Sequence, residues 1–485
     1  MDIRRSHVLA LQAGAALAAT LALGPLDAAG PQSLPYAIRG AAVHTAAGPP
    51  IANGTVVFRD GVIQAVGANV TVPADAIVID GAGLHVYPGL IDMANSAPFA
   101  AAAQPAAGTG GRGGGGGRGG GGGAPQFANR EEAERAKRAE LLKPDFVAAD
   151  NLTTEGDALS ALANAGVTTV LAVPASGIFK GQSALVNVAL PPDDPQISNV
   201  GEYRKGMAVI ASPVAQHIDM AGRGGGPGYP QALLGTMAFT RQGFLDAHWQ
   251  RQARAYFAAG GRGQRPAFEP SLDALAPVLD RAIPAAFEVS EAREIDRALA
   301  MAREFNLDPI VVGASGAAER TAELSAAKAR VILSLNFPGG GQTGGGGRGG
   351  RGGGSPSLRQ LKARVDAPKT AAALVAAGIP FAFTSDGASP ADFVRNAGRA
   401  VREGGLPAEA ALAALTIEAA RLAGAADRIG SLETGKVANV VVTSGDLFDG
   451  GQVRHVFVDG YAVEITPPAP AQGGGRRGGG AARRR

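Results

Sequence analysis

The stretch Val86–Ser96, which reads VYPGLIDMANS, constrains the fold of this chain more than any other segment. An apolar approach meets a Pro-Gly step, and Leu90 and Ile91 then lead into polar residues. A short apolar run bounded by such residues is typical of a buried strand. We therefore expect a core strand here whose far end, at Asn95 and Ser96, is polar.

Between this stretch and the C-terminal region, apolar runs alternate with helical patterns, which predicts a parallel sheet with helical crossovers. The runs are apolar on both faces, as a sheet covered on both sides requires. The expected strands are 168–173, 283–288, 309–312, 331–335 and 380–384. The expected helices are 130–142, 231–257, 290–305, 317–328, 370–377, 391–403 and 407–423.

Both ends of the chain have the pattern of short strands. Near the N-terminus, Thr55–Arg59 and Val62–Val66 flank Asp60-Gly61, a two-residue hairpin signal. Val437–Val442 and Val453–Val458 form the matching pair near the C-terminus. Each pair alone would leave an apolar face bare. We expect residues 36–85 and 426–465 to pack together as one small β-sandwich.

Two motifs resemble the amidohydrolase superfamily, in particular its imidazolonepropionase-like branch. They are the Pro-Gly-Leu-Ile-Asp run at 88–92 and the GSLETGK segment at 430–436. The resemblance implies a (β/α)₈ TIM-type barrel over residues 86–425, joined to the β-sandwich formed by both chain ends. It also implies hydrolysis of carbon–nitrogen bonds other than peptide bonds by metal-activated water.

The metal ligands that the resemblance implies are mostly missing. Ala94 and Ser96 stand where the first strand of the family carries two histidines. Glu288 and the segment 310–313 stand where two later histidines are expected, and Asp386 alone matches its ligand. Zinc needs three or four converging ligands. The sequence therefore predicts a degenerate site with no assigned metal ligands. A divalent metal such as zinc is expected only if the chain is an active hydrolase.

Four residues are candidates for the site. Asp386 and Glu288 are the candidate catalytic carboxylates, and Asn95 and Ser96 are the candidate ligand-binding residues. Each has a purely structural alternative: an Asp before Gly caps helices or turns, and strand-end Asn and Ser satisfy backbone groups. The six histidines (His7, His44, His85, His217, His248 and His455) are expected to be structural or exposed.

Gly/Arg-rich tracts interrupt the chain at 108–123 and 339–354 and end it at 466–485, and a shorter glycine run occupies 222–228. They lack the apolar residues needed to fold, which predicts mobile loops and a disordered tail. Nine arginines lie in the three longer tracts. Removing these from 45 basic residues, against 42 acidic ones, leaves a body with a net charge of −6.

Three functions stay open from the sequence. The first is a weakly active or non-catalytic barrel that binds a small molecule or a related barrel subunit. The second is an active metal-dependent amidohydrolase with a minimal site around Asp386. The third is a polyanion or nucleic-acid binder acting through the Arg/Gly tracts; the absence of aromatic residues from these tracts disfavours base stacking.

The N-terminus predicts export. Arg4-Arg5 precede an apolar run at 8–26 and small residues at 28–30, the layout of a signal peptide over residues 1–29. The chain has no cysteine, which excludes disulfides and thiolate chemistry. We expect a periplasmic or secreted protein without a membrane anchor after cleavage.

If the apolar run is a signal segment, the mature protein begins near Gly30. N-terminal sequencing of protein from the periplasmic fraction measures this directly. Recovery of Met1 from that fraction would contradict the expectation.

Overall fold

The computed structural model describes residues 35–99, 129–153, 157–188, 202–204, 207–221, 229–230, 232–338 and 357–466. The predicted signal peptide and the glycine-rich tracts at 108–123, 222–228 and 339–354 lie outside these ranges, as does the tail after 466. Among the helices of the described ranges, none has both the length and the hydropathy needed to cross a membrane.

Nineteen strands are present in the described residues. They are β1 (Tyr36–Val43), β2 (Ile51–Arg59), β3 (Val62–Gly67), β4 (Ile77–Asp80), β5 (His85–Pro88), β6 (Leu90–Asn95), β7 (Val167–Ala172), β8 (Phe179–Gln182), β9 (Ala184–Asn187), β10 (Glu202–Arg204), β11 (Met207–Ala211), β12 (Gln216–Asp219), β13 (Ala285–Val289), β14 (Pro309–Gly313), β15 (Arg330–Ser334), β16 (Phe381–Thr384), β17 (Val440–Thr443), β18 (Val453–Val458) and β19 (Tyr461–Val463).

Twelve α-helices and three short 3₁₀ turns accompany these strands in the described residues. The helices are α1 (Arg130–Leu141), α2 (Ala158–Asn164), α3 (Leu233–Ala258), α4 (Pro270–Asp273), α5 (Ala276–Leu279), α6 (Ala292–Glu304), α7 (Thr321–Ala326), α8 (Leu358–Asp366), α9 (Thr370–Ala376), α10 (Pro390–Arg402), α11 (Ala408–Leu415) and α12 (Ile417–Leu422). The 3₁₀ turns are η1 (Ala148–Asp150), η2 (Ala317–Glu319) and η3 (Ala367–Lys369).

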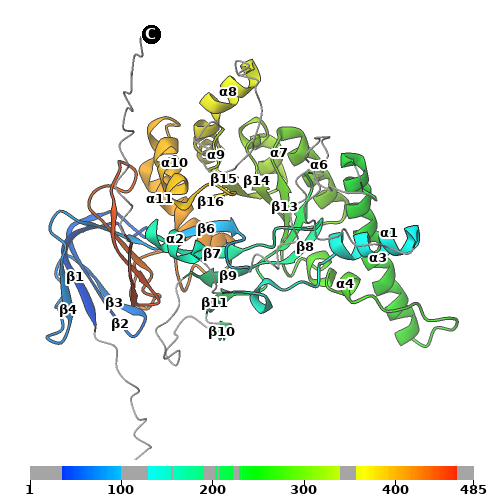
Figure 1. The fold of residues 1–485 in the computed structure, drawn as a ribbon, viewed down its shortest axis with the longest axis horizontal. Helices are drawn as coiled ribbons and strands as arrows, with labels where there is room; N and C mark the ends of the chain where they lie inside the picture. Colours follow the sequence, from blue (N-terminus) through cyan, green and yellow to red (C-terminus); the bar gives the residue numbers. More distant parts are fainter. Residues whose placement is uncertain are drawn as a thin grey trace, which may run out of the picture. The chain divides into compact units, whose positions relative to one another are not determined.

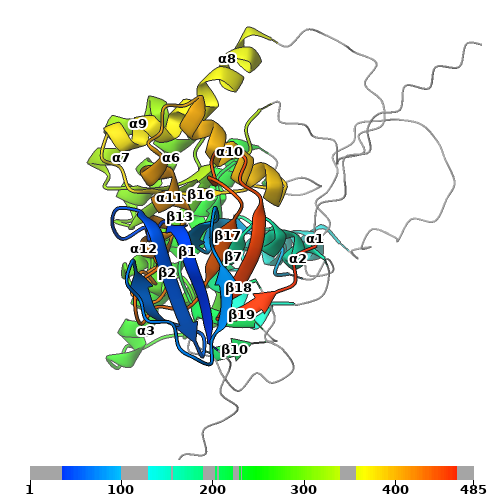
Figure 2. The ribbon, with the colours of Figure 1, turned by 90° about the vertical axis from the view of Figure 1, so that its left-hand side faces the viewer.

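Strands from both chain ends share one sheet, as the sequence predicts. The order is β19-β18-β17-β5-β1-β2-β3, with β4 paired to β1 (Figure 2). Strand β5 pairs with β17 through Pro88, so this sheet extends three residues past the predicted boundary at 85. Backbone hydrogen bonds from β3 to 435–438 also curl the sheet back on itself. The two-layer sandwich itself stays a prediction.

The central part of the chain forms two mixed sheets. One has the order β10-β11-β9-β7-β6 and the other β16-β15-β14-β13-β12-β8 (Figure 1). Strands β12 to β16 are parallel neighbours, and β6 is parallel to β7. Strands β8 and β9 are separated only by Ser183 and belong to different sheets. The chain is thus an α/β protein. Its central strands form two sheets in the described residues, so the structure does not show the single closed eight-stranded barrel that the sequence predicts.

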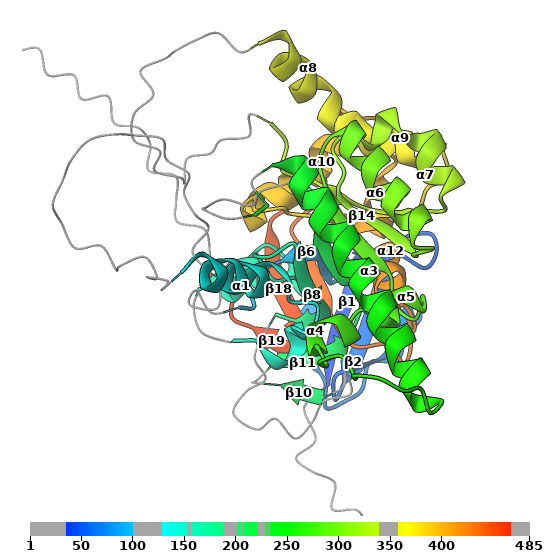
Figure 3. The ribbon, with the colours of Figure 1, turned by 90° about the vertical axis from the view of Figure 1, so that its right-hand side faces the viewer.

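Both faces of these strands are buried, which explains their unbroken apolar sequences. Alternate residues such as Ile91 and Ile310 face one shared apolar cluster that draws on strands from both sheets and on α12. Their neighbours, such as Leu90 and Val311, face a larger cluster beneath the surrounding helices. The first cluster is an interior common to the two sheets, and the long helix α3 lies outside (Figure 3).

Gly89 explains the Pro-Gly step of the opening motif. A Cβ atom at this position would lie 2.0 Å from the Oγ1 atom of Thr168. Only glycine lets the chain pass from β5, in the composite sheet, to β6, in the central sheets, at this close approach. The step is therefore the junction of the two parts of the fold.

The predicted elements are present with some corrections. The helix expected at 317–328 is the 3₁₀ turn η2 followed by the short helix α7. The single helix expected at 407–423 is two helices, because Thr416 leaves helical geometry at φ −136° and ψ −94°. Its hydroxyl instead donates to the Leu412 carbonyl at 2.6 Å. In addition, α8 lies between the second tract and the helix that begins at Thr370. The sequence also left 175–220 unassigned, where β8 to β12 lie.

Asn439 links the composite sheet to the central sheets. Its Nδ2 donates to Thr169 Oγ1 at 3.1 Å and to Asn187 Oδ1 at 2.9 Å, and its Oδ1 accepts from the Asp459 N–H at 2.8 Å. All four residues are buried. A polar group left unpaired in such a site costs about 1–3 kcal/mol.

We expect Asn439→Leu to lower the free energy of unfolding by about 2–4 kcal/mol, because it removes three buried hydrogen bonds and leaves the buried Asp459 N–H without its acceptor. Urea unfolding of the variant measures the loss. Asn53→Leu, at an exposed asparagine of β2, is the control and should change stability by less than about 0.5 kcal/mol. Equal effects at the two positions would refute the bridging role.

Candidate functional site

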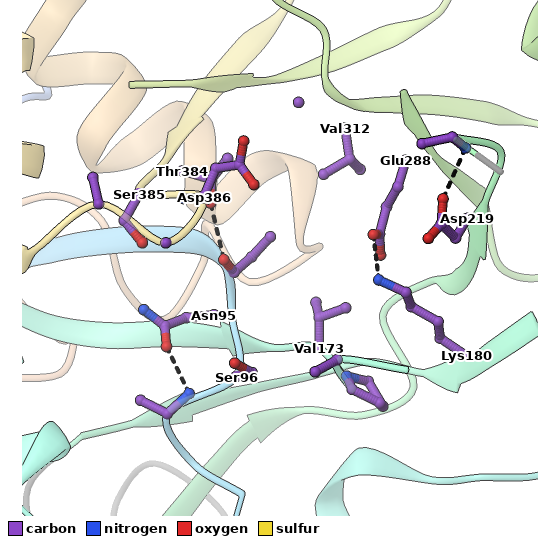
Figure 4. Close-up of a pocket in the computed structure, with 18 of the residues that line it drawn as sticks. Asn95, Ser96, Val173, Lys180, Asp219, Glu288, Val312, Thr384, Ser385 and Asp386 are labelled. Carbon is purple, nitrogen blue, oxygen red and sulfur yellow. Dashed lines mark hydrogen bonds and ion pairs between the residues drawn. The ribbon is translucent and has the colours of Figure 1, made fainter. Parts of the chain in front are cut away.

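A cavity of about 430 Å³ opens at the ends of the central strands and brings together all four predicted site residues. Asn95 and Ser96 line it at the end of β6, Glu288 on β13, and Asp386 after β16. Figure 4 places Ser385 and Asp386 on one side of the cavity and Glu288, Asp219 and Lys180 on the other. The carboxyl ends of parallel strands are where α/β folds carry their sites.

A buried carboxylate joins the first and last of these strands. Asp92 in β6 is fully buried and accepts the Ser385 N–H at 2.9 Å and the Asn95 Nδ2 at 2.8 Å. Burial raises the pKa of Asp92, and the hydrogen bonds from Ser385 and Asn95 oppose this. Thr384 Oγ1 also donates to the Ala94 carbonyl at 2.9 Å. These bonds fix Asp386 beside the end of β6.

Asp386 is held in an uncommon backbone conformation. Its φ is +46°, in the left-handed region that most side chains avoid. Its N–H donates to Thr384 Oγ1 at 3.2 Å, and its carbonyl accepts from Asn336 Nδ2 at 3.0 Å. Backbone strain of this kind is common at functional sites and costs of order 1–3 kcal/mol. The loop therefore presents the Asp386 side chain at the cavity wall in a defined position.

Asn95 serves the local structure with both ends of its amide. Its Nδ2 donates to Asp92, and its Oδ1 accepts the Ala97 N–H at 2.7 Å. The structural alternative raised from the sequence thus accounts for these two contacts. Ser96 lies next to it on the cavity wall, and the ligand-binding role of both residues stays a prediction.

Glu288 forms an ion pair that the sequence did not predict. Lys180 Nζ, on β8, donates to Glu288 Oε2, and the two side chains are 8% and 23% exposed. His217 on β12 is fully buried, with its Nδ1 3.5 Å from Glu288 Oε1. That distance is longer than a normal hydrogen bond, so the contact is weak. Neighbouring strands β8, β12 and β13 supply the three groups.

The charges within this group follow from its burial. Burial alone would raise the pKa of Glu288, but the Lys180 ammonium and the His217 contact outweigh it and lower that pKa to about 2. Burial lowers the pKa of His217, against the opposing effect of Glu288. The carboxylate therefore stays ionised, and the imidazole stays neutral near pH 7.

Gly181 lets Lys180 reach this position. Its φ is +114°, and a Cβ there would lie 2.4 Å from the Phe146 carbonyl oxygen. Glycine is required for both reasons. The FKGQ sequence of β8 was the available signal for Lys180, since a charged residue between apolar residues of a short strand is rarely buried without a partner.

The other histidines lie elsewhere. His44 and His85 are linked, Nε2 to Nδ1, at 3.1 Å. His85 is in β5 and His455 in β18, both in the composite sheet. His248 lies in α3, with its ring 6.2 Å from that of Phe305. His7 is outside the described residues. The expectation that these residues are structural or exposed fits His44, His85, His248 and His455, while His217 is buried at the ion pair.

The donor set at the cavity does not fit the metal that the family resemblance implies. Ala94 and Val312 present hydrocarbon to the cavity, and Glu288 is bonded to Lys180. Within the part of the chain that the structure describes, no three His, Cys, Asp or Glu side chains are grouped to hold a metal ion. Asp386 alone does not make a zinc site, which needs three or four ligands.

Comparisons with known proteins identify the fold. Residues 357–463 match the amidohydrolase family. The structure is similar to an amidohydrolase from Thermotoga maritima MSB8, with a TM-score of 0.65 and 22% identity over 89% of this chain and 100% of that chain. A prolidase complexed with N-methylphosphonate-L-proline has a TM-score of 0.50 and 15% identity, over 89% of this chain and 100% of that chain. No curated protein matches the sequence.

The predicted resemblance to the amidohydrolase superfamily is therefore confirmed. The solved relatives imply a TIM-like arrangement of the central strands. At these identities they inform the fold, whereas the activity depends on the residues at the cavity.

A double-mutant cycle tests the Lys180–Glu288 pair. We expect Lys180→Met or Glu288→Gln alone to cost about 3–5 kcal/mol, since each leaves one buried charge unpaired. The double variant should be less destabilised than the sum of the two single variants.

The pairing also predicts a pH dependence. Because the folded-state pKa of Glu288 lies below its usual 4.5, the stabilising effect of the ionised carboxylate is present above pH 4.5 and lost as the pH falls toward 2.

Urea unfolding at pH 7 and at pH 3 measures both effects. The stability difference between wild type and Glu288→Gln should shrink at the lower pH. Additive single losses, or a difference that does not depend on pH, would refute the pairing.

Proposed function

We propose that this chain is an amidohydrolase-like protein that binds a small molecule at its cavity, with weak or no metal-dependent hydrolysis. The observation that carries the proposal is the Lys180–Glu288 ion pair, which engages one of the two candidate catalytic carboxylates. The apolar side chains of Ala94 and Val312 line the same cavity and cannot bind a metal, which supports the proposal further. The imidazolonepropionase-like branch is the relationship that the sequence motifs favour.

We also propose that the central strands close into a barrel. Strands β8 and β9, continuous through Ser183, would join the two central sheets on one side. The Thr384–Ala94 and Ser385–Asp92 hydrogen bonds would join β16 to β6 on the other. The shared apolar interior supports such a ring of eight strands. The composite sheet would then be the accompanying sandwich.

Lys180 and Glu288 would bind and orient the ligand. The ammonium has three N–H donors, of which Glu288 takes one, and it lines the cavity wall. Ser96 and Ser385 add hydroxyl groups along the same wall. A polar uncharged molecule with acceptor oxygens, such as an amide, suits such a lining.

A hydrolase with a minimal site is the second candidate. Asp386 supports it, because its side chain lies at the cavity wall on a strained loop that faces Glu288 across the cavity. A carboxylate in such a position could act as a general base toward water.

Export to the periplasm, and a related barrel subunit as partner, remain proposals that rest on the sequence alone.

Restoring the two missing imidazoles tests the degenerate site. We expect purified wild-type protein to hold well under one zinc per chain and to hydrolyse cyclic amides and acyl dipeptides poorly. Ala94→His with Ser96→His should gain zinc, because two imidazoles would then flank the Asp386 carboxylate. Metal analysis after dialysis against zinc measures the content.

The matched control adds Asp386→Ala to the double-histidine variant and should lose most of the gained zinc. Stoichiometric zinc in the wild type that is lost on Asp386→Ala would overturn the non-catalytic proposal. It would favour the minimal-site hydrolase instead.

A further inference from the structure

Helix α3 carries an exposed apolar stripe along its length. Leu234, Leu245, Trp249 and Tyr256 are 81%, 47%, 58% and 55% exposed. At 100° per residue they lie within about 60° of one another around the helix axis. Figure 3 shows α3 as a long helix on the outside of the central sheets. A solvated helix face normally carries polar residues, so an exposed apolar stripe of this length indicates a binding surface.

The stripe is separate from the face that holds α3 to the protein. Phe239, Phe244 and Ala247 are buried on that face. Phe244 packs against Phe179 with ring centroids 5.3 Å apart. The helix is therefore anchored without its outer apolar residues, which remain available for a partner.

The charges along α3 are already neutralised within the chain. Arg241 pairs with Glu304, and Asp246 with Arg138. Further along the helix, Arg251 and Arg254 pair with two aspartates, Asp280 and Asp273. A strongly charged partner would therefore find these groups already matched. A neutral, apolar surface is the complementary one, and a second copy of α3 offers that surface.

We propose that α3 pairs antiparallel with α3 of a second copy, about a two-fold axis near residue 247. That register places Leu245 opposite Trp249, and small Ala238 opposite large Tyr256. Gln242 then faces Gln252. The Gln242 Nε2 donates to Asp246 within the chain, and its Oε1 can accept from the Gln252 amide of the second copy. All six of these residues are exposed in the single chain. Two-fold pairing of identical surfaces is the commonest form of homo-oligomer.

The size of the stripe suits a dimer of moderate affinity. Its four large side chains expose on the order of 500 Å² per copy, given about 150–250 Å² for a fully exposed large side chain. A stable interface buries about 800 Å² per partner. The flanking alanine, glutamine and arginine side chains of a helix about 39 Å long supply the remainder.

Sedimentation equilibrium of the full mature chain tests the pairing. We expect a dimer that Trp249→Glu weakens by about 30-fold or more, as loss of a central aromatic anchor does. Val375→Glu, an exposed apolar residue of α9, is the matched control and should leave the dimer intact. A wild-type monomer at 100 µM, or equal weakening by both variants, would overturn the proposal.

Disulfide cross-linking tests the register, and the absence of native cysteine gives a clean background. Gln242→Cys and Gln252→Cys are about 15 Å apart within one helix, too far to bond within a chain. Mixing the two single variants under mild oxidation should give a covalent heterodimer, and each alone should give little. Equal cross-linking by each single variant alone, or none in the mixture, would refute the antiparallel register.

Discussion

The structure depends on the junction between β6 and β16, where buried Asp92 accepts the Ser385 N–H from nearly 300 residues further along the chain. A buried carboxylate is costly unless its oxygens are bonded, and here Asn95 and Ser385 satisfy it. Because these hydrogen bonds can form in only one register of β6 and β16, they fix the position of Asp386 relative to the end of β6. The positions of Asn95, Ser96 and Asp386 at the cavity follow from this junction.

On the side of the cavity opposite that junction, the cation that pairs with Glu288 is the ammonium group of Lys180. Lys180 bonds to Glu288, which burial beside His217 would otherwise leave as a costly isolated charge. The pair neutralises Glu288 without an external metal. The positions implied as histidine ligands hold Ala94, Ser96, Glu288 and the segment 310–313. The same fold thus carries different residues at these positions, and function depends on such site residues.

Much of this could be predicted from the sequence. The Pro-Gly-Leu-Ile-Asp run marked β6, and the paired β patterns at both ends marked the composite sheet. Asn95, Ser96, Glu288 and Asp386 were predicted to lie at the ends of strands, and the structure brings those ends together at one cavity. Lys180 and His217 were missed because β8 and β12 are only four residues long, too short for periodicity to identify. Asp92 was seen only as part of a motif, since its partner Ser385 is distant in sequence.

The most direct test of the account is a crystal structure of the wild-type protein soaked in excess zinc, with anomalous scattering recorded at the zinc edge. The account predicts no ordered zinc in the cavity, and Lys180 Nζ within hydrogen-bond distance of Glu288. A strong anomalous peak ligated by Asp386 and Glu288, with Lys180 displaced, would contradict it.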